Sequence, residues 1–487
     1  MNPTPPPLPK ALHHQKRVLR IVFLGVSVVV LLCVGAFVFY RLTLLRKIAE
    51  HLESIRKAGY PVTLLELNPW YPEVPPDENA AIIYTNAFAH FVQGNTNSSA
   101  LPLFGRGKLP PRNAGLSVEM KLAIEDLLAK NQETLELLHE GAHRNKCRYP
   151  VDVTPGPETL LPHLVRLKAS AQLLELEALM KAEAGDAAGA VRSIEDLWAL
   201  ANSLEQEPIL ISQLVRVAGH EMAISALERI LNRHPIAADQ LAKLCRILNV
   251  ADNDLWLRRA WIGERCFGLA IFNMPTKKLH SMLHNDQSTP SGSIQSTGPV
   301  ETMFEFLGFW LMRISGHLDR DELFFLETTD SYLRAVDVSF PNRLQTAEHI
   351  NASVSGNSVY RKRERWPFII SGLLLTPPGK VFNKGAQHTA HLRSVIVGLA
   401  LERHRASHND RLPQRLQELV PELLTEVPLD PFDGNPLRYK RLPKGYVVYS
   451  VGPDGHDNDG QEKKTLSNLQ KISGAEEPYD ITFTVGR

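Results

Sequence analysis

The sequence predicts a mainly α-helical protein with a single transmembrane helix near the N-terminus and a small α+β domain at the C-terminus. Three observations predict this fold class: an uncharged stretch at residues 21–40, apolar residues that recur every three or four positions through the centre, and short β-forming segments near the end. The predicted divisions are a proline-rich cytoplasmic tail (1–20), a transmembrane helix (21–41), a helical domain (42–385) and an α+β domain (386–487).

The overall composition argues against several function classes. The 487 residues include 54 basic and 53 acidic ones, so no global charge favours nucleic acid or acidic partners. Four cysteines are too few for a disulfide scaffold; apart from Cys33 in the apolar stretch, Cys147, Cys245 and Cys266 allow at most one intramolecular bridge. No nucleophile-elbow, phosphate-loop or dinucleotide-binding motif occurs, and no small-molecule substrate is evident.

The stretch Ile21–Tyr40 has the length and composition of a membrane span. At about 1.5 Å per residue, such a helix covers roughly 30 Å, the thickness of a bilayer core. It is longer than the apolar part of a signal peptide, and Arg20 and Arg41 bracket it. Basic residues lie on both sides, so charge hardly discriminates the orientation. The short tail favours a single-pass inner-membrane protein with a cytoplasmic N-terminus and the bulk of the chain in the periplasm.

The central region reads as a stack of amphipathic helices. Asp77 is a plausible N-cap for the first, and Ser117 opens the second. Further helices are predicted over residues 160–184, 188–204, 209–231 and 237–248. The hairpin Ala182–Ala190 is similar to a tetratricopeptide hairpin, although no 34-residue period accompanies it. Helical-hairpin stacks of this kind usually serve as scaffolds or binding surfaces.

The aromatic segment Met303–Ile314 has two interpretations. It could lie on the membrane surface, as amphipathic aromatic helices do. Its neighbours Arg313, His317, Asp319 and Arg320 favour an ordinary buried helix instead. We therefore expect a buried helix.

The sequence His139-Glu140-Gly-Ala-His143 has the spelling of a zinc-protease motif. Two histidines four residues apart on a helix can bind zinc, and the glutamate between them can act as a general base. However, the polar run that follows ends at Pro150, and no third ligand stands out. Cys147 extends the same spacing and offers a structural metal cluster as another interpretation. We expect a chance match on a solvated helix edge, with a membrane-bound metallopeptidase as the alternative function.

The last hundred residues have a different pattern. A helix is predicted over His388–His408, a short helix over Leu416–Leu424, and strands over residues 437–441, 445–451 and 480–485. Valine and tyrosine residues supply the β-forming content of the strands.

These elements carry a family resemblance. The order of Asn409-Asp-Arg-Leu-Pro413, DPFDGNPLRY at residues 430–439 and GYVVYSVGPDG at 445–455 resembles the C-terminal domain of the major pseudopilin of type II secretion systems. The resemblance covers about residues 388–487, and the central region resembles uncharacterised bacterial envelope proteins. Pseudopilins join their membrane helix directly to this domain, whereas over 300 residues intervene here. Assembly into a pilus by the family's helix packing is therefore not expected.

The resemblance implies a calcium site. The matching positions are Ser450, Asp454, Asp457, Asp459 and Asp480. The loop chemistry agrees in kind, because aspartate and asparagine oxygens are the ligands that calcium prefers, although an EF-hand reading fails. We expect a non-enzymatic envelope scaffold or accessory protein with a calcium-stabilised C-terminal module. Its partners would be the membrane and proteins of secretion or pilus-like machinery.

Overall fold

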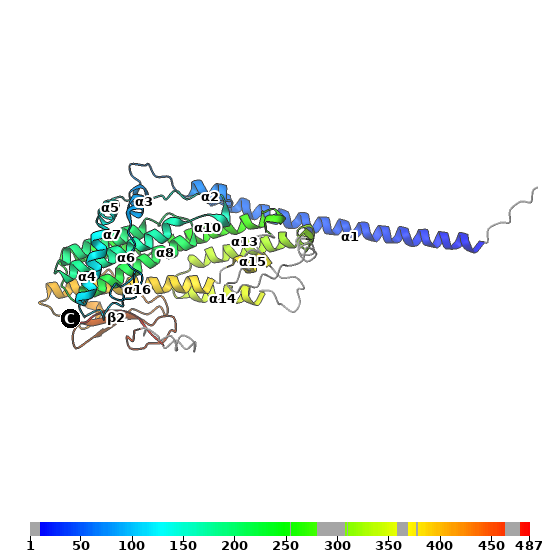
Figure 1. The fold of residues 1–487 in the computed structure, drawn as a ribbon. Helices are drawn as coiled ribbons and strands as arrows, with labels where there is room; N and C mark the ends of the chain where they lie inside the picture. The colour runs from blue at the N-terminus through cyan, green and yellow to red at the C-terminus, as the bar shows by residue number, and fades with distance from the viewer. Residues whose placement is uncertain are drawn as a thin grey trace, which may run out of the picture. The chain divides into compact units, whose positions relative to one another are not determined.

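The protein is mainly helical, with one small antiparallel sheet near the C-terminus (Figure 1). The computed structural model describes residues 10–253, 255–279, 307–308, 310–357, 369–375, 378–462 and 478–487. The chain divides into two compact units. We call residues 1–60, 274–326 and 368–371 the anchor unit, and residues 61–273, 327–367 and 372–487 the main unit.

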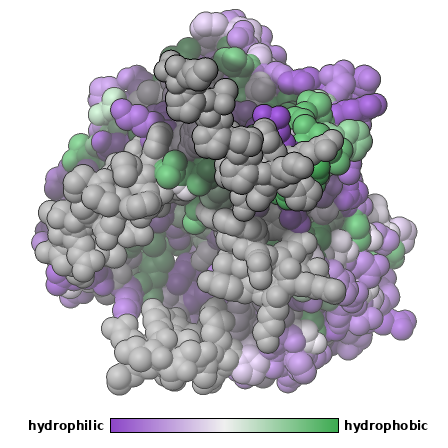
Figure 2. All heavy atoms as spheres, turned by 90° about the vertical axis from the view of Figure 1, so that its right-hand side faces the viewer, coloured by the Kyte–Doolittle hydropathy of each residue, from purple (hydrophilic) through white to green (hydrophobic). Residues whose placement is uncertain are grey.

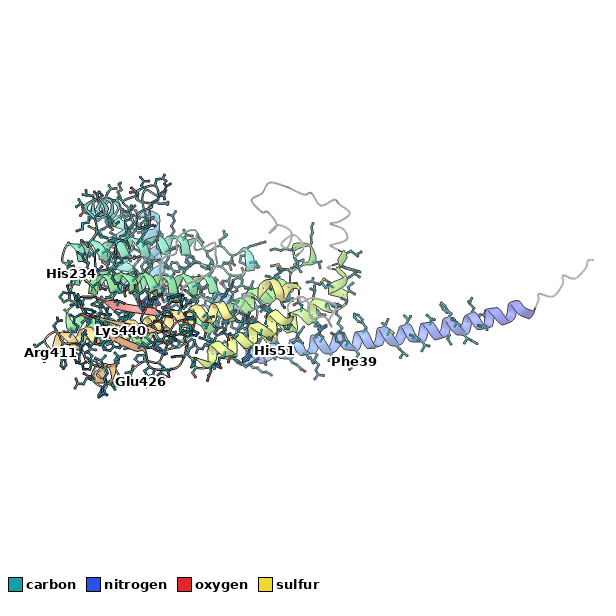
Figure 3. The ribbon with its side chains drawn as sticks, turned by 90° about the horizontal axis from the view of Figure 1, so that it is seen from below. Phe39, His51, His234, Arg411, Glu426 and Lys440 are labelled. Carbon is teal, nitrogen blue, oxygen red and sulfur yellow. The ribbon has the colours of Figure 1, made fainter. Side chains whose placement is uncertain are left out.

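The anchor unit begins with one long helix, α1 (Lys10–Lys57), which is 48 residues long. Its stretch Ile21–Tyr40 is apolar and largely solvent-exposed, and the helix is long and apolar enough to cross a membrane. Farther along, Leu44, Ile48 and Ile55 are buried on one face. Figure 3 labels Phe39 on the exposed part and His51 near the buried stripe. The predicted membrane helix and the segment after it, which buries one apolar face, are therefore one continuous helix.

The main unit is built around three long helices, α6 (Pro162–Glu183), α7 (Ala187–Asn202) and α8 (Leu210–Leu231). They pack against one another and lie side by side (Figure 1). A side chain at Gly219 would collide with Ala201, which shows how closely α7 and α8 approach. A tetratricopeptide-like repeat is not confirmed, but the four helices predicted between residues 160 and 248 are present within a few residues of their expected bounds.

Other helices surround this core. They are α2 (Leu64–Trp70), α3 (Ala80–His90), α4 (Val118–Lys130), α5 (Gln132–Ala142), α9 (Ala238–Ala251), α10 (Leu255–Phe272), α14 (Asn342–Asn357) and α16 (Pro378–Ser407). Two more, α13 (His317–Val336) and α15 (Ile369–Leu374), cross the division between the units. Short 3₁₀ turns occupy Gly156–Glu158 and Leu416–Leu419.

Side-chain caps explain where several helices begin. Ser117 accepts a hydrogen bond from the Met120 N–H at 3.2 Å, as the sequence predicts. The prediction of Asp77 as an N-cap is wrong: Asn79 caps α3 by accepting from the Ala81 N–H at 3.1 Å. Asn79 is favoured because the helix begins at the next residue, within reach of its short side chain.

The sheet consists of β1 (Arg438–Arg441), β2 (Tyr446–Ser450) and β3 (Ile481–Val485), antiparallel and in that order. Figure 3 labels Lys440 on β1. Helix α16 packs against β2 and β3 and also against α9 and α14. Its Gly398 lies so close to Phe483 that an added side chain would clash, and the Tyr446 hydroxyl donates to the Gly398 carbonyl at 2.9 Å.

Helix α16 therefore joins the sheet to the helical core. The predicted domain boundary between residues 385 and 386 falls inside this helix and inside the main unit. One hydrophobic core holds residues from both sides of that boundary, such as Leu197 of α7 and Phe483 of β3. The four cysteines of the chain are all free thiols.

Candidate functional site

Two of the five residues predicted to bind calcium, Asp454 and Asp480, lie close together. The Asn458 side-chain nitrogen is 3.2 Å from Asp454 Oδ2 and 3.4 Å from Asp480 Oδ1. The buried Asp480 carboxylate also accepts from the backbone N–H groups of Asn458 at 3.2 Å and Gly460 at 2.7 Å. Burial raises the pKa of Asp480, and these hydrogen bonds oppose that shift.

The other three predicted ligands face different partners. Asp457 Oδ2 lies 3.9 Å from Arg438 Nε, Asp459 forms an ion pair with Lys440, and the Ser450 hydroxyl donates to a buried aspartate. As arranged, the five side chains do not form one coordination shell. Within the described residues, no group of three or more His, Cys, Asp or Glu side chains is placed to hold a metal ion. Calcium binding stays a prediction.

The buried aspartate is Asp430, which motif reasoning did not single out. It is 1% exposed, and its carboxylate accepts four hydrogen bonds. The donors are Ser450 Oγ at 2.8 Å, Arg438 Nη1 at 2.9 Å, and the N–H groups of Phe432 and Val451, each at 2.9 Å. Asp430 thus holds the Asp-Pro-Phe turn against the end of β2. The only sequence signal for it is its place at the start of that turn.

In this fold, the first histidine of the zinc-protease motif, His139, faces two carboxylates. Helix α5 ends at Ala142, and His143 is its exposed C-cap. Both ring nitrogens of His139 face carboxylates: Nδ1 lies 2.7 Å from Asp196 Oδ2, and Nε2 lies 3.1 Å from Glu177 Oε1. A zinc ligand needs a ring nitrogen that faces the metal. The geometry therefore favours an ion-paired histidine over a zinc ligand.

The charge state of His139 agrees with this interpretation. Hydrogen bonds to Asp196 and then to Glu177 raise the pKa of His139 to about 9, although burial opposes the shift. The imidazole is then protonated at neutral pH and donates through both N–H groups. Glu140, the general base of the alternative interpretation, is exposed to solvent.

His139 lies at the edge of a large open groove, which we call the α5–α7 groove. It has a volume of about 1120 Å³ and is lined by residues of α3, α5, α6, α7 and α9 and of the loops after α5 and α7. One face of α7 forms a stripe along it, from Arg192 through Asp196 and Ala199 to Asn202. This spacing of three and four residues is that of one helix face.

The dimensions of the groove suit a polypeptide segment. Ten residues of helix between Arg192 and Asn202 span about 15 Å, which corresponds to four or five residues of extended chain. Its volume of about 1120 Å³ exceeds the roughly 300–1,000 Å³ typical of small-molecule sites. An open groove of this volume, with such a helix face along it, favours a chain over a compact ligand.

Charge at the groove is distributed unevenly. Most of its charged side chains are paired: Lys181 with Glu177, Lys243 with Glu195, Lys146 with Glu78, and Glu205 with Arg216. The exposed guanidinium groups of Arg144 and Arg192 have no ion-pair or hydrogen-bond partner in the described part of the chain. On the acidic side, Glu73 at the rim also lacks such a partner there. Two cations against one carboxylate remain to meet a ligand.

An aromatic residue, Trp198, lines the groove from below. It is 4% exposed, and its ring stacks on His220 with 3.8 Å between the centroids. Among the described atoms its indole N–H has no hydrogen-bond acceptor. The Nε2 atom of His220 lies 3.0 Å from Asn202 Oδ1. Burial lowers the pKa of His220 well below its usual value, so this histidine is neutral.

A series of polar side-chain contacts starts at His220, beside Trp198, and connects α8 to α16. His220 Nδ1 lies 3.4 Å from His388 Nε2. His388 and His391 then share Glu221, with Nδ1–Oε distances of 2.9 Å and 2.6 Å. Burial alone would lower the pKa of His391, but the charge and hydrogen bond of Glu221 outweigh it, and the net shift is upward. These residues link the groove wall to the helix that supports the sheet.

Comparisons with known proteins give no information on the function of this chain. No family model, no curated protein and no solved structure matches the chain. The resemblance of residues 388–487 to the pseudopilin domain accordingly stays a prediction.

Proposed function

We propose that the chain is a membrane-anchored scaffold or accessory protein that holds a partner polypeptide in the α5–α7 groove. The observation that carries this proposal is the groove itself, which is open and bordered by two arginines that have no side-chain partner among the described residues. Helix α1, which is long and apolar enough to span a bilayer, would be the membrane anchor.

The partner segment that fits best carries a carboxylate. Arg144 lies in the loop after α5, and Arg192 lies near the start of α7. A guanidinium binds a carboxylate through two parallel hydrogen bonds, which makes it specific for such groups. Ala199, half-buried between the polar positions, offers apolar contact for the rest of the segment. An acidic, extended stretch of a partner protein meets both requirements.

The cellular setting follows from the sequence. The uncharged stretch Ile21–Tyr40 supports a membrane anchor, which we place in the inner membrane with the bulk of the chain in the periplasm. The resemblance of the C-terminal region to a pseudopilin domain supports a partner from secretion or pilus-like machinery. In this setting the sheet region, with its predicted calcium site, stabilises the scaffold.

A photo-crosslinking experiment tests the proposal. The full-length protein carries p-benzoylphenylalanine at position 199 in native membranes, and its protein adducts are identified by mass spectrometry. A hydrogen bond to a charged group contributes about 1.5–3 kcal/mol. Losing both arginine contacts should therefore weaken binding at least tenfold. We expect the double variant Arg144→Glu/Arg192→Glu to lose the adduct.

The matched control is Arg166→Glu, on α6. Arg166 is exposed and lies outside the groove. This variant should keep the adduct of the parent protein. The proposal is wrong if position 199 yields no protein adduct, if the double variant keeps it, or if Arg166→Glu loses it equally.

The metallopeptidase alternative has its own test. His139 and His143 both line the groove, so a peptide bound there would lie near them. Purified full-length protein should contain no stoichiometric zinc, because His139 already pairs with two carboxylates. Zinc that is lost in His143→Ala, together with proteolysis that is lost in Glu140→Gln, would favour the enzyme.

A further inference from the structure

The anchor unit exposes an apolar helical stripe outside α1. Leu307, Trp310, Leu311 and Ile314 are 45%, 48%, 53% and 42% exposed, respectively. They follow the spacing i, i+3, i+4, i+7 of one helix face. For these four residues the sequence-based expectation of a buried helix is wrong, because the charged neighbours take the inward contacts. Arg313, for example, donates to the Met274 carbonyl at 2.8 Å.

Exposure alone does not identify what covers such a stripe. Single hydrophobic residues reach the surface at several places (Figure 2) and need no explanation. Four on one face form a patch, however, and patches mark contact surfaces. What covers this patch must therefore be inferred from its position relative to the apolar stretch of α1.

Arg41 fixes that position. Its Nη1 donates to the Ile314 carbonyl at 3.0 Å, and its Nε donates to Asp319 Oδ2 at 3.1 Å. Arg41 is the first charged residue after the uncharged stretch that begins at Ile21. Because that stretch is as long as a bilayer core is thick, Arg41 reaches the headgroup level.

The stripe therefore lies close to that level as well. Trp310 and Leu311 precede Ile314 by four and three residues on a helix, so they lie within about 6 Å of it along the helix axis. Leu42 and Leu45 of α1, 60% and 42% exposed, continue the apolar surface just beyond Arg41. By contrast, Leu44 and Ile48 on the other face are buried within the protein.

We infer that Leu307, Trp310, Leu311 and Ile314 insert into the lipid–water interface of the membrane that α1 crosses. The inference rests on the membrane anchor of the proposed function. Tryptophan at this depth fits, since its ring is apolar and its N–H can reach water or headgroups. The anchor unit then touches the bilayer twice, through the span and through this stripe, which would fix its depth and restrict rotation about α1.

Photo-crosslinking at defined depths tests the inference. The full-length protein in native membranes carries p-benzoylphenylalanine at position 311, and adducts are separated into lipid and protein by mass spectrometry. Position 39, near the C-terminal end of the uncharged stretch Ile21–Tyr40 of α1, reports on the span itself. Position 53 is exposed and lies twelve residues beyond Arg41, about 18 Å along the helix.

We expect lipid adducts at positions 39 and 311 and none at position 53. Lipid at 39 but not at 311 would overturn this inference and leave the anchor intact. No lipid at 39 would instead refute the anchor. A protein adduct at 311 would assign the stripe to a partner chain and also overturn the inference.

A second measurement avoids the unnatural residue. In liposomes whose lipids carry bromine near the headgroup end of the acyl chain, contact quenches tryptophan fluorescence. Trp310→Phe should remove a quenched component from the spectrum, because Trp310 would contact these lipids. If the component removed by Trp310→Phe is unquenched, Trp310 does not touch lipid.

Discussion

The α5–α7 groove and the C-terminal aspartate loop differ in whether their charged side chains have partners within the protein. In the loop, three of the four carboxylates accept from a nearby backbone N–H: Asp454 from His456 at 3.0 Å, Asp457 from Asp459 at 2.9 Å, and Asp480 from Gly460 at 2.7 Å. The fourth, Asp459, forms an ion pair with Lys440. In the groove, Arg144 and Arg192 have no described partner. Polar groups that already have hydrogen-bond or ion-pair partners within the protein stabilise its fold, whereas exposed groups that lack such partners are available to a ligand. The motif-dense loop is thus the weaker candidate for partner binding.

The largest effect should come from Asp430, the most deeply satisfied carboxylate beside the loop. In Asp430→Asn the side chain keeps one acceptor oxygen and presents an NH₂ group to donors. Several of its four hydrogen bonds are lost, and the buried donors stay unsatisfied. We expect a loss of about 3–4 kcal/mol in the free energy of unfolding. Denaturant titration of the full-length protein in detergent measures it.

The control for this prediction is Asp433→Asn. Asp433 binds the same Arg438, but its side chain is 23% exposed. Ion pairs of this kind near the surface contribute up to about 1 kcal/mol. Equal losses in the two variants would show that burial of Asp430 is not what makes it important.

Calcium should have the next largest effect, and it tests the comparison directly. To bind the ion, Asp457 and Asp459 must turn away from Arg438 and Lys440 toward Asp454 and Asp480. If they do, 1 mM calcium at a Kd of about 10 µM stabilises the fold by about 2.7 kcal/mol. Thermal unfolding of the full-length protein should then shift upward by a few degrees relative to a chelator.

Asp480→Asn should abolish the calcium shift, because it removes the carboxylate that the fold buries beside Asp454. Magnesium at the same concentration should produce little shift, since its rigid octahedral geometry tolerates fewer protein ligands. Identical melts in calcium and chelator would exclude the calcium site, and the loop would then hold its shape by hydrogen bonds alone.

Local patterns predicted the helices and strands well. Ser117 caps its helix because the signal lies within three residues, and the tyrosines and valines of β2 form a strand within one residue of the expected bounds. The start of α16 was missed by ten residues: it begins at Pro378, where proline is tolerated in the first turn. The choice between Asp77 and Asn79 as the N-cap depends on the residue at which the helix begins, and the sequence pattern does not show that residue.

The groove could not be predicted in the same way. Its walls come from five helices whose proximity depends on packing, and Arg144 and Arg192 look like ordinary surface residues in sequence. The one usable signal was on α7, where Arg192, Asp196 and Asn202 place polar groups along one face of the helix. The His139 motif was visible, but not its two carboxylate partners, which α6 and α7 supply.

The smallest expected effect is the pH dependence of stability that His139, at the edge of the α5–α7 groove, contributes. His139 has a pKa raised from 6.5 to about 9 by Asp196 and Glu177. Its pKa in the folded state is above that in the unfolded state, so the stabilisation is complete below pH 6.5 and is lost as the pH rises toward 9. The side chain is 30% exposed, and solvent screening reduces the effect. We expect about 1–2 kcal/mol.

The measurement is the free energy of unfolding at pH 6 and pH 9 for the parent protein and for His139→Gln. Other groups titrate over this range, including the half-buried His391, but they contribute equally to both proteins and cancel in the difference. The parent should therefore lose about 1–2 kcal/mol more than the variant between the two pH values. His143→Gln, an exposed neighbour at the same groove, should behave like the parent. A variant with the parent's pH dependence would mean that His139 is not held as a cation, which would reopen its role as a metal ligand.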